Sequence, residues 1–127
     1  MADYLTVAEI YVMQHRLVER FGGVHGVRDK GAVEAAVFRP QLGYYSCIEE
    51  ETAALMESLA NNQGFLDGNK RIAFAAADVF LRRKGLYIEV EAEEGYAFIV
   101  GSMERREFCL AKILDWIRQH TKPARDL

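Results

Sequence analysis

The chain has 127 residues, of which 50% are hydrophobic, and its formal net charge is −3. This length suits one domain around one core, so residues 1–127 are expected to form a single domain. General nucleic-acid binders are usually basic, and the acidic balance therefore argues against direct binding of nucleic acid. A local phosphate site stays open, because the field in a pocket depends on the residues that line it.

The sequence shows no sign of export or membrane insertion. The N-terminal segment lacks the basic and apolar regions of a signal peptide, and no apolar run approaches the roughly 20 residues of a membrane span. We therefore expect a cytoplasmic protein without membrane contact. The two cysteines favour free buried thiols over a disulfide. The three histidines, His15, His25 and His120, lack the spacing of a metal site.

Helix signals recur through the first two thirds of the chain. Thr6 and Glu9 form a capping box ahead of apolar residues at helical spacing, and a pair of glycines ends that helix. Asp29 can cap a short second helix, which Pro40 stops. Three glutamates at 49–51 mark the N-terminus of a third helix. The helices expected in this part span about 6–21, 30–38, 49–61 and 69–84.

The helix expected over about 69–84 is apolar on every side of its middle part except at Asp78. A helix that is apolar all round is usually buried, so this one is expected at the centre of the fold. The segment 86–90 alternates with period two and predicts a short extended stretch. Two more helices are expected over about 91–102 and 105–120, followed by a frayed tail. The fold class is therefore all-α, a compact single-domain bundle of about six helices around a buried central helix.

The segment from Asn62 to Arg71 carries the most chemistry. Gly68 permits a tight turn, and the helix that follows offers free N–H groups and a positive dipole end, which favour anions. Lys70 and Arg71 add two positive charges at the same place, and Asp67 is a carboxylate suited to Mg²⁺ beside a phosphate. A plain loop–helix junction explains the same residues, since Asp-Gly is a common turn and Lys-Arg is often solvated surface. The residue types alone leave both readings open.

The spacing within this segment resembles the motif of the Fic/Doc family, H-x-F-x-[D/E]-G-N-x-[K/R]. The matching residues are Phe65, Asp67, Gly68, Asn69 and Arg71. The continuation into Ile72-Ala73, together with upstream segments at 4–6, 26–31 and 34–41, is most similar to the Doc branch, the death-on-curing toxins. The resemblance covers nearly the whole chain and implies the all-α Fic/Doc fold.

The resemblance also implies an activity. Family members transfer part of a nucleoside triphosphate to a protein hydroxyl, and most of them transfer AMP. The Doc branch resembles a kinase that phosphorylates a threonine of translation elongation factor Tu. An antitoxin of the Phd type covers its groove. The resemblance thus implies a toxin of a toxin–antitoxin system that uses Mg²⁺ and ATP or another nucleoside triphosphate.

Roles for single residues follow from the same resemblance. Asp67 would bind Mg²⁺, Gly68 and Asn69 would form an anion hole with backbone N–H groups, and Lys70 and Arg71 would hold phosphates. Asp67 and Arg71 would thereby belong to the catalytic machinery as well.

Two further expectations concern the surroundings of the motif. Phe65 would anchor the loop in the core. The loop around Arg28-Asp29 would lie near the site as a flap, although a plain helix cap at Asp29 explains that residue as well.

Two positions, one compared with the AMP-transferring members and one with the Doc branch, bear on which group is transferred. AMP-transferring members carry a second arginine where this chain has Phe74. The Doc branch also lacks that arginine, which favours phosphate transfer. Doc is however typified by Asp-Ala-Asn, whereas this chain has the commoner Fic form with Gly68.

The largest departure is Gln63, which occupies the position of the family's histidine. An imidazole can accept the proton of an attacking hydroxyl near neutral pH, whereas an amide can only position that hydroxyl by hydrogen bonding. Loss of a general base costs about 10²–10⁴-fold in rate, so the chain is expected to be impaired. An engineered variant, a natural inactive homologue and a different base all remain open explanations. A catalytically inactive binding homologue is thus an alternative to both transferases.

Overall fold

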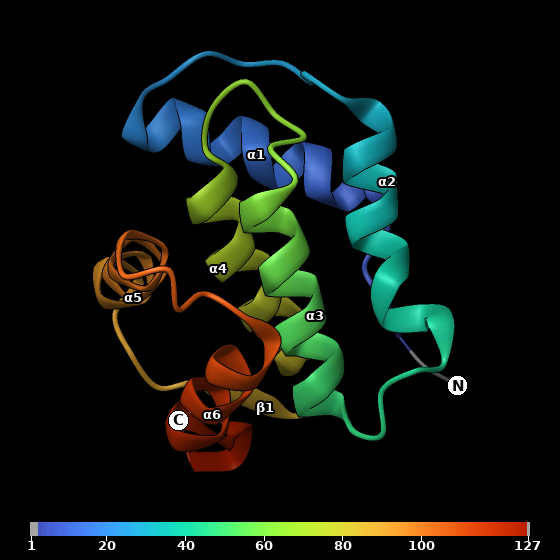
Figure 1. The fold of residues 1–127 in the computed structure, drawn as a ribbon, viewed down its shortest axis with the longest axis vertical. Helices are drawn as coiled ribbons and strands as arrows, with labels where there is room; N and C mark the ends of the chain where they lie inside the picture. Colours follow the sequence, from blue (N-terminus) through green and yellow to red (C-terminus); the bar gives the residue numbers. More distant parts are fainter. Residues whose placement is uncertain (1–2, 127) are drawn as a thin grey trace.

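The computed structural model describes residues 3–126, while Met1, Ala2 and Leu127 lie outside the described part (Figure 1). The described chain forms six α-helices: α1 (Val7–Phe21), α2 (Lys30–Phe38), α3 (Ile48–Asn61), α4 (Asn69–Arg82), α5 (Ala92–Glu104) and α6 (Leu110–His120). Short 3-10 helices cover Arg39–Leu42 and Ala124–Asp126, and the strands β1 (Leu86–Ile88) and β2 (Thr121–Pro123) form a small antiparallel sheet. The all-α class is confirmed. None of the helices in residues 3–126 is long and apolar enough to cross a bilayer.

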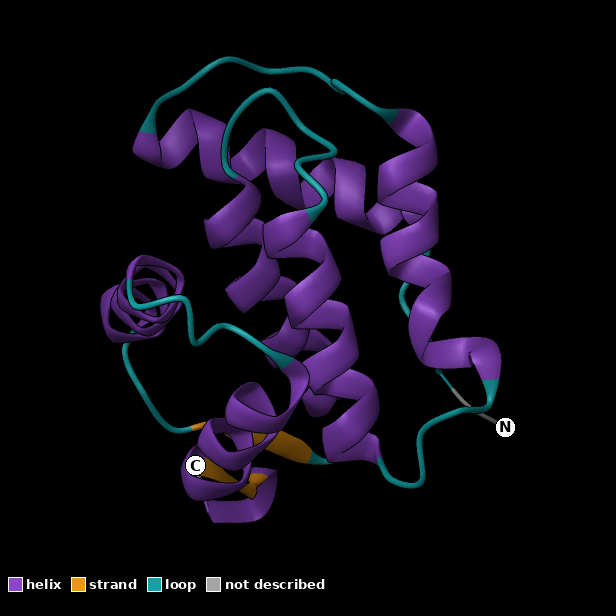
Figure 2. Ribbon diagram, in the orientation of Figure 1, coloured by secondary structure: helices purple, strands orange, loops and turns teal. Residues whose placement is uncertain are grey.

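The α4 helix lies at the centre, as its all-round apolar pattern predicts. Figure 2 shows α3 and α4 side by side, with the other helices arranged around this pair. Ile72, Ala73 and Ala76 of α4 are fully buried. Ile99 of α5 and Ile113 of α6 are also fully buried. The helix α4 therefore belongs to one packed core that it shares with α5 and α6.

Two of the predicted helix caps are present. The side chain of Thr6 accepts a hydrogen bond from the backbone N–H of Glu9, whose carboxylate in turn accepts from the backbone N–H of Thr6. Asp29 accepts from the N–H of Ala32 at 3.1 Å. Arg83, at the far end of α4, donates to the Glu9 carboxylate and so ties α1 to α4. This ion-paired hydrogen bond and the cap lower the pKa of Glu9 to about 2.

Two expectations about the elements are wrong. The helix expected from residue 105 begins only at Leu110, because Arg106 adopts a left-handed conformation with φ 58° that ends α5 in a turn. The tail is not frayed, since Thr121–Pro123 pairs with Leu86–Ile88. The expected end of the second helix is confirmed, because α2 ends at Phe38, ahead of Pro40. The chain then continues through Pro40 as a 3-10 helix, in which proline is tolerated near the first position.

The cysteines are free, as expected, but neither is buried. Cys47 is half-buried ahead of α3, and Cys109 is exposed ahead of α6. Both residues occupy N-cap positions, where the chain approaches the helix from the surface.

Candidate active site

The loop before α4 turns sharply into the helix at Gly68. This residue has φ +83°, in the left-handed region that glycine adopts without a steric penalty, and its carbonyl accepts the first helical hydrogen bond from Ile72 at 2.8 Å. The N–H groups of Asn69, Lys70 and Arg71 belong to the first turn, which has no intrahelical partners for them. The end of the buried helix therefore offers backbone donors together with two basic side chains.

The side chain of Asn69 holds this loop in shape. Its amide oxygen accepts from the N–H of Phe65 at 3.1 Å, and its amide nitrogen donates to the carbonyl of Phe65 at 3.0 Å. Phe65 is only 2% exposed and packs edge-on against the ring of Tyr11, so its predicted position in the core is confirmed. The sequence motif identified Asn69, but nothing in the sequence indicated this two-bond bridge.

The segment after α1 runs alongside the loop and contacts its acidic residue. The N–H of Val24 donates to the Asp67 carboxylate at 2.7 Å, and the amide of Gln14 donates to the Asp67 carbonyl at 3.1 Å. Leu66 donates from its N–H to the carbonyl of Gly26 at 3.1 Å. The conformation at Asp67 thus depends on residues 40 to 53 positions earlier, a dependence that single-sequence patterns do not reveal.

The guanidinium of Arg71 lies between two aromatic rings. It is 3.9 Å from the ring centroid of Phe21 and 4.2 Å from that of Tyr96, and it donates to Glu93 at 2.9 Å. These contacts join α1, α4 and α5 at one edge of the site. The predicted phosphate-holding arginine is therefore held in place by three neighbours.

Gln63 has an unusual backbone conformation. Its φ of 50° lies in the left-handed region, and Arg28 donates both to its carbonyl, at 3.3 Å, and to its side-chain oxygen, at 3.2 Å. The loop at Arg28 therefore lies near the site, as expected, while Asp29 serves as the cap of α2. Histidine is one of the residue types that populate this backbone region more than most, so the position also suits an imidazole.

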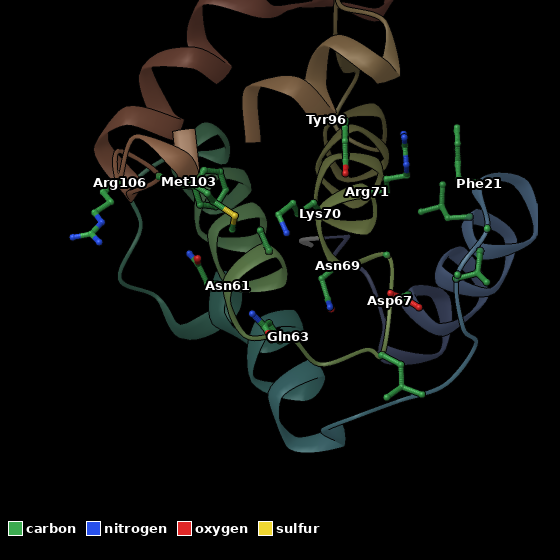
Figure 3. Close-up of a pocket in the computed structure, with 18 residues that line it drawn as sticks. Phe21, Asn61, Gln63, Asp67, Asn69, Lys70, Arg71, Tyr96, Met103 and Arg106 are labelled. Atoms are coloured by element: carbon green, nitrogen blue, oxygen red, sulfur yellow. The ribbon is translucent and has the colours of Figure 1, made fainter. Parts of the chain in front are cut away.

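All six predicted site residues line one pocket of about 790 Å³. They are Gln63, Asp67, Gly68, Asn69, Lys70 and Arg71. Figure 3 shows Gln63, Asn69 and Lys70 around the hollow, with Asp67 and Arg71 toward Phe21. The remaining wall includes residues that sequence patterns did not single out, among them Tyr96, Met103, Arg106 and Phe108. The structure brings the predicted residues together, and their chemical roles remain predictions.

The residues present fit a metal–nucleotide pair. A carboxylate has about four acceptor sites, so Asp67 keeps capacity for a hard cation after accepting the bond from Val24. Lys70, Arg71 and the end of α4 are donors suited to phosphate oxygens. The volume is within the range of about 300–1,000 Å³ typical of small-molecule sites.

The buried central helix of this bundle presents its N-terminus, a carboxylate and two basic residues to an open pocket. This combination of fold and site defines the class of the protein. The Fic/DOC family matches residues 4–81, and the chain belongs to this family. The matched part runs from the residues before α1 to the last turn of α4 and includes the whole loop before α4.

Two relatives support the same assignment. A Mycolicibacterium smegmatis protein named Toxin Doc is 43% identical over 76 residues, which are 56% of this chain and 58% of that protein. A protein of Escherichia phage P1 named Protein kinase doc is 30% identical over 89 residues, covering 67% of this chain and 71% of the relative. The chain thus spans less than two thirds of the first of these relatives.

Proposed function

We propose that this chain is the toxin of a toxin–antitoxin pair and that its pocket binds a nucleoside triphosphate for phosphate transfer to a protein hydroxyl. The observation that carries the proposal is the junction at Asp67–Arg71, where one carboxylate, two basic side chains and the end of a buried helix line one pocket. The similarity to proteins named Toxin Doc and Protein kinase doc supports both halves of the proposal.

Asp67 is the residue we assign to Mg²⁺. When bound, the ion would neutralise phosphate charge. Lys70 and Arg71 would bind phosphate oxygens, and the N–H groups of Gly68 and Asn69 would contribute to an anion hole. The rings around Arg71 would keep its guanidinium oriented before the nucleotide arrives, which reduces the entropy lost on binding.

Position 63 limits the proposed reaction. The target oxygen attacks the terminal phosphorus, the nucleoside diphosphate leaves, and the hydroxyl proton has to pass to a base. The amide of Gln63 cannot take that proton, so it can only orient the hydroxyl. A histidine there would have the cationic Arg28 beside it, which favours the neutral imidazole that a base requires. We therefore expect this chain to be strongly impaired but restorable by one substitution.

The first test is Gln63→His, expressed in a bacterial host while growth and protein synthesis are followed. We expect the His form to arrest both and to transfer phosphate about 10²–10⁴-fold faster than the parent chain. Gln63→Asn is the matched control, because asparagine also tolerates left-handed φ but is no base. Adding Asp67→Asn to the His form should abolish the arrest.

The outcomes separate the alternatives. Equal toxicity of the Gln and His forms would show that Gln63 is not disabling. If the His form is inert yet binds Mg²⁺ and ATP, the chain is a binding homologue without chemistry.

Phosphate transfer is favoured over AMP transfer by the packing at Phe74. This side chain is 8% exposed and packs against the ring of Trp116. A buried core residue thus stands at the position where AMP-transferring members have their second arginine. ATP labelled on the γ- or α-phosphate distinguishes the reactions. Label from the γ-position on translation elongation factor Tu is the expected result, whereas label from the α-position would establish AMP transfer.

The proposed partner is a Phd-like antitoxin that covers the pocket. The rim of the pocket exposes large apolar side chains, with Phe21 at 40% and Leu66 at 51% exposure, which an antitoxin segment can bury. Co-expression of a neighbouring Phd-like gene should restore growth of cells that make the Gln63→His form. We place this interaction in the cytoplasm, where the translation factor acts, and continued growth arrest would argue against the pairing.

A further inference from the structure

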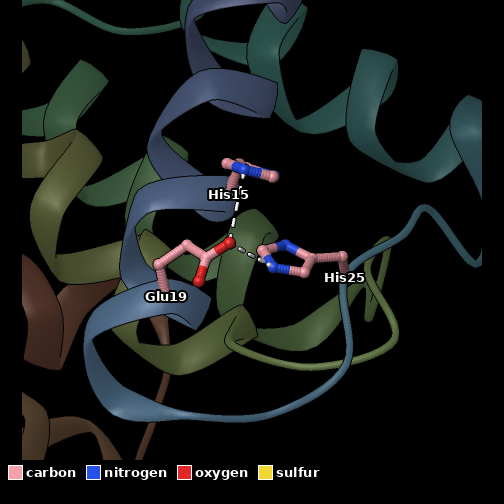
Figure 4. Close-up of side chains that lie close together, drawn as sticks. All are labelled: His15, Glu19 and His25. Carbon is pink, nitrogen blue, oxygen red and sulfur yellow. Dashed lines mark hydrogen bonds and ion pairs between the residues drawn. The ribbon is translucent and has the colours of Figure 1, made fainter.

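Three side chains on the surface converge at a place that the proposed reaction does not use. His15 and Glu19 lie one turn apart on α1, and His25 reaches them from the segment that follows the helix (Figure 4). The rings of the two histidines stack with centroids 4.1 Å apart and an interplanar angle of 27°. Both rings direct Nε2 toward the same oxygen of Glu19, at 3.6 Å from His15 and 3.1 Å from His25.

We propose that His15, Glu19 and His25 form a binding site for a divalent transition metal, with Zn²⁺ as the preferred ion. Two imidazoles and one carboxylate are a ligand set that binds Zn²⁺ in proteins while leaving a fourth position to water. Nitrogen ligands disfavour Mg²⁺, which prefers oxygen. The site is therefore chemically distinct from the Mg²⁺ site proposed at Asp67.

The spacing of the donor atoms fits a tetrahedral ion. Donors about 2.1 Å from Zn²⁺ in tetrahedral geometry lie about 3.4 Å from one another. The two histidine–glutamate separations of 3.6 and 3.1 Å bracket that value, and one ligand atom from each residue lies within 4.8 Å of the other two. To bind one ion, the stacked rings have to turn so that both Nε2 lone pairs point at it, and the exposure of all three side chains leaves room for this rotation.

The position of His25 gives this site a consequence for the neighbouring loop. Val24, next to His25 in sequence, donates to the Asp67 carboxylate at 2.7 Å, and Gly26 accepts from Leu66 at 3.1 Å. An ion shared by His25 and the two α1 ligands would hold the segment 22–27 against α1. Zn²⁺ would thereby restrict motion of the residues that contact Asp67.

The test is a calorimetric titration of Zn²⁺ into the whole chain and into single variants, with excess Mg²⁺ present to occupy oxygen-only sites. One Zn²⁺ per chain is expected. His15→Ala, Glu19→Gln and His25→Ala should each weaken binding by at least about tenfold, since even loss of an outer partner of a ligand has effects of that size. His120→Ala is the matched control, because that residue lies at the end of α6 and bonds to Trp116.

Thiols also bind zinc, so a chain with Cys47→Ser and Cys109→Ser is titrated in parallel and should bind as the parent does. Circular dichroism verifies that each variant is folded, and His25→Gln offers a second variant in the loop if the alanine form is unstable. Unchanged affinity in folded His15 and His25 variants, or binding lost only with the cysteines, would overturn the proposal.

Discussion

The guanidinium of Arg71 illustrates how single residues prepare the pocket. Its ion pair with Glu93 involves an acid that is 67% exposed, so the pair contributes only about 0–1 kcal/mol. The rings of Phe21 and Tyr96 do more to fix its orientation, because they enclose the planar cation on two sides. In the proposed nucleotide complex, a phosphate would displace Glu93, and the two rings would keep the guanidinium oriented.

We therefore expect Arg71→Ala to weaken the binding of Mg²⁺ and a non-hydrolysable ATP analogue by about 10- to 100-fold, the range for hydrogen bonds to charged groups. Isothermal titration calorimetry of the Gln63→His chain measures this directly. Arg82→Ala is the control, because Arg82 lies at the far end of α4 and pairs with Asp78. Equal affinities for the parent and Arg71→Ala would remove Arg71 from the nucleotide site.

The sequence predicted which residues line the site but not the contacts that orient them. The motif identified Asp67, Asn69 and Arg71, and all three line the pocket. The contacts that orient them come from Val24, from the backbone of Phe65 and from two distant rings. The contacts of Val24 and of the two rings are long-range and leave no periodic mark in the sequence, so these partners could not be predicted. The bridge between Asn69 and Phe65 is local, but it depends on the loop conformation and not on a repeating pattern.

At the scale of elements, an ion pair joins the N-terminal end of α1 to the C-terminal end of α4. Glu9 closes the capping box of α1 and accepts from Arg83, which follows α4. Its pKa of about 2 is below the ordinary 4.5, so the folded state binds fewer protons than the unfolded chain there. The contribution to stability is thus present above about pH 4.5 and is lost as the pH falls toward 2.

A double-mutant cycle of Glu9→Gln and Arg83→Gln tests whether this contribution to stability falls as the pH is lowered. We expect a coupling free energy of about 1 kcal/mol at neutral pH, the upper end for partly exposed pairs, since Glu9 is 36% and Arg83 25% exposed. Urea unfolding at several pH values should show the coupling shrinking below about pH 4.5. A coupling that stays constant to low pH would contradict the assignment of this ion pair.

The contact between α4 and α5 depends on a glycine. A Cβ at Gly95 would lie 2.2 Å from Cε1 of Phe74, so no other residue fits without movement of the ring or the helix. Gly95→Ala is expected to lower the free energy of unfolding by about 1–3 kcal/mol through overpacking.

Gly101→Ala in the same helix is the matched control for this prediction. The new Cβ there would meet only the flexible end of Arg105, at 3.1 Å, and alanine favours helix, so the change should be neutral or slightly stabilising. Urea unfolding distinguishes the two variants. Equal stabilities would show that α5 does not pack closely on Phe74.

Helices with strong caps were predictable, and the irregular connections were not. The capping box at Thr6, the cap at Asp29 and the glutamates in the first turn of α3 predict three N-termini to within one residue of the structure. The break before α6 rests on the left-handed Arg106, where no glycine or proline signals a turn. Tertiary packing sets that conformation, and local sequence signals therefore gave the wrong start for α6.

At the scale of the whole molecule, the pocket draws on both halves of the chain. The family match ends at residue 81, yet Tyr96 and Met103 of α5 line the pocket beside Gly68 and Lys70 of the matched part. Ile113 and Ile117 of α6 are fully buried and hold this second half against the core. The packing of the C-terminal part against the core thus determines the position of α5. Because α5 forms one wall of the pocket, the shape of the site depends on this packing as well.

The tail beyond α6 helps to hold the C-terminal part in place through hydrogen bonds. β2 pairs with β1, the hydroxyl of Thr121 donates to the Ile117 carbonyl, and Ala124 donates from its N–H to Gly85 at 2.8 Å. Deleting residues 121–127 removes all of these bonds, and with about 1 kcal/mol for each hydrogen bond we expect a loss of about 1–3 kcal/mol in the free energy of unfolding.

Urea unfolding of the chain that ends at His120 measures this loss. A chain that ends at Ala124 is the control, because it keeps β2 and the bond to Gly85 and should remain within about 0.5 kcal/mol of the parent. A frayed tail would make both deletions neutral. If only the longer deletion destabilises the chain, the two-stranded sheet fastens α6, and through α6 and α5 it supports the wall of the pocket opposite the loop before α4.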